Sequence, residues 1–117
     1  MIYISEPIWL ETTLLLLKIT IFHMSVGRNN VIELLNDLKI EIEKQLTVTN
    51  DNEINMGDIL KFSNLMPNRL LDSGLDSVTK DSLLKFTNTL YAGATTLENL
   101  QLRLDDLNQI LKILQSN

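Results

Sequence analysis

The chain has 117 residues, 44% of them hydrophobic and 5% aromatic, which suits a single domain whose core is mostly leucine and isoleucine, as in helical bundles. Its formal net charge is −5, and its ten Lys and Arg residues are scattered along the chain, so direct binding of DNA or RNA is not expected. The absence of cysteine excludes disulfides and thiolate catalysis and fits a reducing compartment, so the cytoplasm or nucleus is the expected location.

The first 23 residues differ in composition from the rest of the chain. They contain no Asn and no Asp, whereas twelve Asn and all of the Asp residues follow from Met24 onward. We therefore divide the chain into an apolar leader, residues 1–23, and a helical domain, residues 24–117. One hypothesis is that Met24 is a second start and that the leader is an extension or a targeting piece.

The apolar stretch in this leader is either a membrane segment or a buried helix. Residues 8–24 span only 17 positions and carry Glu11 and Lys18, both of which are costly near the centre of a bilayer. A buried helix that starts near Pro7 is the other alternative, because proline is tolerated in a first turn. Contact with a membrane is therefore expected only through residues 8–24.

The next segment has the pattern of an amphipathic helix. Asn30 followed by Glu33 is typical of a capped helix start, and the helix is predicted from about Val31 to Leu46. Apolar residues recur at three and four positions, and we predict that they form a secondary packing face: Val31, Leu34, Leu35, Leu38 and Ile42.

A loop and two short helical pieces are predicted next. Residues 47–55 are polar and rich in Asn, which is typical of a loop. A short helix is expected over residues 56–66, after which Pro67 disfavours continuation but can open a further turn. Gly74 is placed to end that turn in the left-handed conformation.

The strongest pattern is a ladder of apolar residues over five heptads near the C-terminus, on a helix capped by Ser77 or Thr79. Apolar residues at the a and d positions form one stripe that must be buried against other helices. We predict a long heptad-patterned, coiled-coil-like helix whose stripe binds partner helices through Leu83, Phe86, Leu90, Leu97, Leu100, Leu104, Leu107, Leu111 and Leu114. Five further apolar residues widen this stripe: Leu84, Tyr91, Leu102, Ile110 and Ile113.

The ladder does not specify a simple homodimeric zipper. It lacks β-branched residues at its a positions, and its flanking positions carry almost no charge. The 32 residues from Leu83 to Leu114 would span about 48 Å, twice the predicted Val31 helix, so other helices or another chain must cover the remainder. Gly93 marks either a bend between two shorter helices or a site of close helix approach.

Nothing in the sequence predicts catalysis, a cofactor or a metal site. His23 is the only histidine and lies in the leader, and one histidine without cysteine cannot supply an ordinary zinc site. A calcium loop that starts at Asp51 fails, because Met56 takes the place of the required glycine. No glycine-rich phosphate loop is present in the sequence.

These observations predict an all-α helical bundle. We expect a non-enzymatic subunit of a multiprotein complex, with a scaffold role, that binds other protein subunits through its C-terminal helix as a hetero-oligomer. Two alternatives are a self-contained four-helix adaptor domain and a peripheral membrane protein anchored by residues 8–24.

Overall fold

The computed structural model describes residues 26–93 and 96–116. Within these ranges the regular elements are helical and no strand occurs. A helix covers residues 26–45 and is followed by the 3-10 turn η2 (Asp51–Glu53), α2 (Met56–Ser63), α3 (Met66–Leu71), α4 (Ser77–Gly93) and α5 (Leu97–Ser116). The predicted all-α helical bundle is confirmed.

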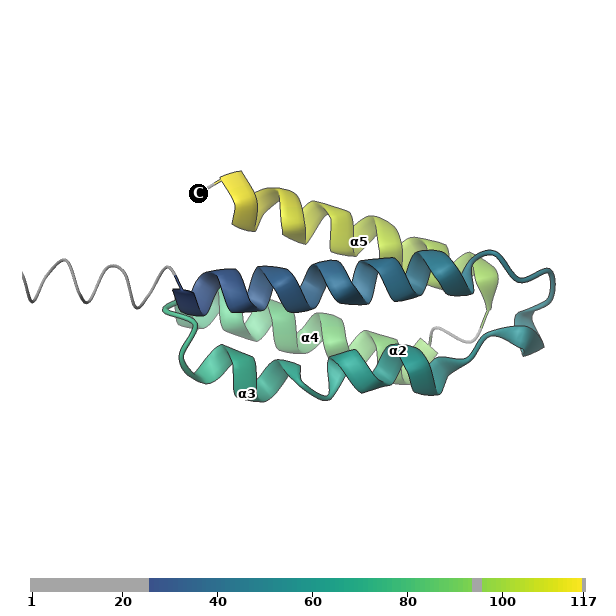
Figure 1. The fold of residues 1–117 in the computed structure, drawn as a ribbon, viewed down its shortest axis with the longest axis horizontal. Helices are drawn as coiled ribbons and strands as arrows, with labels where there is room; N and C mark the ends of the chain where they lie inside the picture. The colour runs from purple at the N-terminus through teal and green to yellow at the C-terminus, as the bar shows by residue number, and fades with distance from the viewer. Residues whose placement is uncertain (1–25, 94–95, 117) are drawn as a thin grey trace, which may run out of the picture.

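The described helices form four antiparallel segments, which we call legs, that run alternately in opposite directions (Figure 1). The 26–45 helix is the first leg, α2 and α3 together form the second, and α4 and α5 are the third and fourth. Such an up-down-up-down arrangement needs only short connections between neighbouring legs. The described part of the chain thus has the architecture of a four-helix bundle.

The leucine ladder lies on two helices rather than on one long helix. Its first half is on α4 and its second half is on α5, which returns in the opposite direction (Figure 1). The backbone N–H of Leu97 donates to Asp51 Oδ1 at 2.8 Å, and that of Asn99 donates to Thr96 Oγ1 at 3.1 Å, so the new helix start is capped. Gly93 ends α4, so it marks the break between two shorter helices rather than a site of close approach within one long helix.

A single apolar core lies between the four legs. Every leg contributes to it, and its members are at most 8% exposed: Val31, Leu34, Leu35, Leu38, Ile42, Ile59, Met66, Leu70, Leu83, Phe86, Leu90, Leu100, Leu104, Leu107, Leu111 and Leu114. Burial of this apolar surface is the main force that holds the legs together.

The helix expected from Val31 begins earlier than the sequence pattern indicates. Residues 26–30 are already helical, so Asn30 lies inside the helix rather than at its cap. Its carbonyl oxygen accepts a hydrogen bond from Arg69 Nη1 of α3 at 3.2 Å. Gly27 lies in this extension. A Cβ there would overlap the Asp72 carbonyl oxygen, so only a glycine lets the helix pass this close to the loop before α4.

The other helix ends agree in part with the sequence predictions. Pro67 lies in the first turn of α3, and Gly74 adopts a φ of 71° after it, as predicted. The residue that caps α4 is Asp76 rather than Ser77 or Thr79, since Asp76 Oδ1 accepts a hydrogen bond from the Thr79 N–H at 2.7 Å. The α2 helix ends at Ser63, before the predicted Met66.

Candidate interaction surface

The residues predicted to bind a partner lie almost entirely inside the bundle. Eight of the nine are buried in the core of the single chain, and Leu97 is half-buried. In this fold the first half of the ladder on α4 and the second half on α5 belong to one core cluster. These side chains are therefore reached by a partner helix only if the bundle opens.

The predicted secondary packing face is buried in the same core. All five residues of the set, from Val31 to Ile42, are at most 2% exposed. The structure thus brings both predicted residue sets together, so each provides cover for the other.

The predictions for the leader fall outside the described residues. These predictions concern the leader itself, residues 1–23, the apolar stretch 8–24 and His23. Among residues 26–93 and 96–116, no helix has both the length and the apolar character that a bilayer crossing requires.

An apolar groove runs between α4 and α5. It consists of two adjoining hollows of about 300 and 140 Å³, which share Ser82, Ile110 and Ile113. We call it the α4–α5 groove, and its other lining residues are Val78, Thr79, Leu83, Lys85, Phe86, Thr89, Asp106, Gln109 and Leu114. Because the helices are antiparallel, the start of α4 faces the end of α5 across it.

The groove has a buried apolar floor and an exposed apolar entrance. Leu83 and Phe86 are 1% and 5% exposed and belong to the core beneath it. Val78 and Ile113, where α4 begins and α5 ends, are 74% and 60% exposed. Apolar surface exposed beside a groove marks a binding surface more often than scattered apolar residues do.

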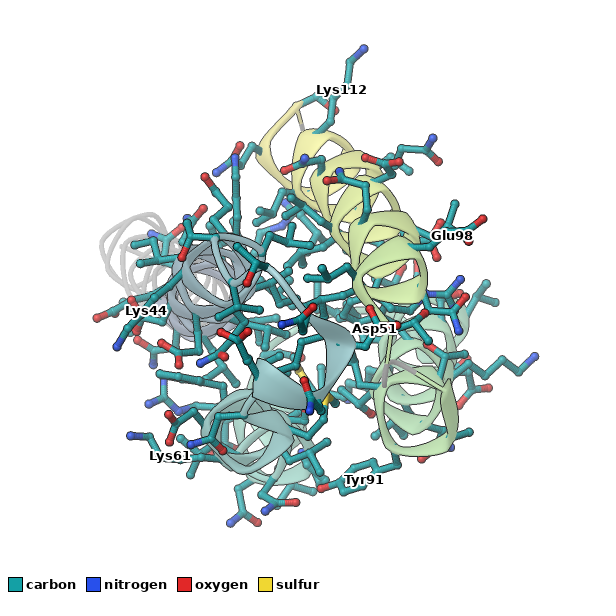
Figure 2. The ribbon with its side chains drawn as sticks, turned by 90° about the vertical axis from the view of Figure 1, so that its right-hand side faces the viewer. Lys44, Asp51, Lys61, Tyr91, Glu98 and Lys112 are labelled. Carbon is teal, nitrogen blue, oxygen red and sulfur yellow. The ribbon has the colours of Figure 1, made fainter. Side chains whose placement is uncertain are left out.

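Charged residues stand at the rims of the groove and over the rest of the surface. Lys85 lies on the α4 rim and Asp106 on the α5 rim, and Asp106 forms an ion pair with Arg103 at 3.4 Å. Away from the groove, Lys44, Lys61 and Lys112 point outward from the bundle (Figure 2). The groove is therefore an apolar strip within a charged, solvated surface.

Sequence reasoning missed the groove as a site, although one signal for it was present. Ile110 and Ile113 stand out as apolar residues that widen the ladder on α5. The α4 side gives no comparable signal, since Val78 is a single apolar residue in a polar first turn. The groove exists only because α5 folds back beside α4.

Two polar side chains of the described residues have clear structural roles. Asp76 caps α4, and a hydrogen bond from the Thr79 side chain, with a second from its backbone, lowers the pKa of the Asp76 carboxyl. Gln45 links two legs, because its Oε1 accepts from the Asn55 N–H at 2.9 Å. Within the described ranges, no group of three or more His, Cys, Asp or Glu side chains is placed to hold a metal ion.

Comparisons of the chain with protein-family models, with curated proteins and with solved structures find no match. The evidence for a function therefore comes from the fold and from the α4–α5 groove.

Proposed function

We propose that this chain is a non-enzymatic interaction subunit, a self-contained four-helix bundle that binds a helix of a partner protein in its α4–α5 groove. The observation that carries the proposal is an apolar groove that the described residues leave open beside a core that they close by themselves. The partner is a different protein of a multiprotein complex, in which the bundle has a scaffold role. We place this complex in the cytoplasm or nucleus.

The energetics favour the groove over the leucine ladder as the contact surface. Exposing one buried leucine side chain to water loses about 1.5–3 kcal/mol of burial free energy, whereas the free energy of unfolding of a whole domain is about 5–15 kcal/mol. Five leucines of α5 are buried in the core. Lifting α5 away from the bundle to bind a partner would therefore forfeit most of the stability of the fold.

The length of the groove matches a helix of about three turns. From Val78 to Thr89 the α4 wall extends about 17 Å at 1.5 Å per residue. An amphipathic helix lies in such a groove by placing apolar residues at i, i+3 or i+4, and i+7 against the floor. The charges of Lys85 and Asp106 would then form a polar rim around the apolar contact.

A matched pair of exposed isoleucines tests the proposal. Ile113 lies in the groove and is 60% exposed, whereas Ile40 lies on the 26–45 helix, outside the groove lining, and is 65% exposed. Both Ile113→Asp and Ile40→Asp should fold, as checked by circular dichroism and thermal melting. We expect Ile113→Asp alone to lose the partner that the wild-type chain retains in quantitative affinity purification. Retention of the same partner by both variants would refute the groove as the binding surface.

A further inference from the structure

The 26–45 helix begins at the end of the bundle where α4 begins and α5 ends. Val26, the first described residue, lies at the end where α4 begins and α5 ends (Figure 1). Gly27 packs against the Asp72–Ser73 backbone, in the loop that leads into α4. The exposed Val78 and Ile113 lie at this same end of the groove. Residues 1–25 are therefore tethered at the end of the bundle where Val78 and Ile113 are exposed.

The leader sequence is apolar and long enough to fill the groove. Ten of the fifteen residues from Ile8 to Phe22 are Leu, Ile, Phe or Trp. Filling the groove over about 17 Å takes about twelve residues even at a helical rise, and residues 23–25 add a connection of up to about 10 Å.

We propose that residues 8–22 bind in the α4–α5 groove of their own chain, as an intramolecular ligand that a partner helix must displace. The inference rests on the groove named in the proposed function. The short tether favours the chain's own leader over that of a second copy, because a linked segment binds at a high effective concentration. The same contact covers the apolar leader and the exposed groove residues at once.

The chain is suited to a direct test because Trp9 is its only tryptophan and it contains no cysteine. A nitroxide label is attached to the full chain at Gln109→Cys, in the groove, or at Asn108→Cys, the adjacent exposed position that does not line the groove. The label quenches tryptophan fluorescence only at short range. We expect a marked loss of Trp9 emission with the label at position 109 and little loss with the label at position 108.

Two further measurements identify the occupant of the groove. Quenching from position 109 should persist when labelled chain is diluted into excess unlabelled chain, and Ile113→Asp should relieve it. Quenching that disappears on dilution would overturn the proposal in favour of a second copy. Equal emission from both labelled variants would also overturn it, as would Trp9 protection only on addition of phosphatidylcholine–phosphatidylserine vesicles. Partner loss in Ile113→Asp tests the proposed function separately and does not depend on where Trp9 lies.

Discussion

Replacing Leu107 with alanine truncates a side chain that is 0% exposed in the middle of α5. The mutation loses the transfer free energy of the removed isopropyl group and leaves a cavity in the core, so the expected destabilisation is about 2–5 kcal/mol. Leu102, on the same helix, is 48% exposed. Leu102→Ala should lower the free energy of unfolding by about 1 kcal/mol or less, because only part of its surface is buried and solvent fills the vacated space. The contrast measures whether α5 packs on its own chain.

Urea unfolding followed by circular dichroism at several protein concentrations gives both free energies of unfolding. The Leu107→Ala curve should shift to lower urea at an unchanged slope, and neither midpoint should depend on protein concentration. A cost for Leu107→Ala as small as that of Leu102→Ala would refute the closed bundle. A midpoint that rises with protein concentration would show that the ladder is covered by another chain.

Three further substitutions, with Gly57→Ala as a control, test individual contacts of the fold. Gly27→Ala should destabilise the protein by about 1–3 kcal/mol in thermal melts, because its Cβ overlaps the loop before α4, whereas Gly57→Ala, with only a side-chain oxygen at 3.2 Å, should be near neutral. Asp76→Ala should lower the melting temperature at neutral pH. Hydrogen bonds from Thr79 lower the pKa of the Asp76 carboxyl below 3.8 in the folded state, so its carboxylate stabilises the fold fully above that pH. The difference in melting temperature between wild type and Asp76→Ala should therefore vanish as the pH falls through the folded-state pKa. Asp51→Ala should cost about 1 kcal/mol and speed amide hydrogen exchange in the first turn of α5, since Asp51 accepts the Leu97 N–H; unchanged exchange there would contradict the capping role.

Local features of the fold were predictable where a short stretch of sequence contains the whole cause. The apolar residues from Val31 to Ile42 recur with the helical period, so their common face follows from helix geometry alone. Pro67 and Gly74 restrict the backbone wherever they occur, and both take the predicted places in the first turn and after the end of α3. The earlier helix start did not follow from the pattern of Asn30 and Glu33, and the close packing of Gly27 against the Asp72 carbonyl within it joins residues far apart in the chain.

The period of the leucine ladder was sufficient to require burial of its residues, because one apolar stripe on a helix cannot remain in water at an acceptable cost. Periodicity carries no information about which surface provides the cover. That depends on the chain reversal between α4 and α5. One contact at the reversal is the hydrogen bond that the Leu97 N–H donates to Asp51, 46 residues away. The reversal turns a predicted partner-binding stripe into a core and creates the groove between α4 and α5. Local periodicity thus specifies what must be buried, and long-range contacts decide where.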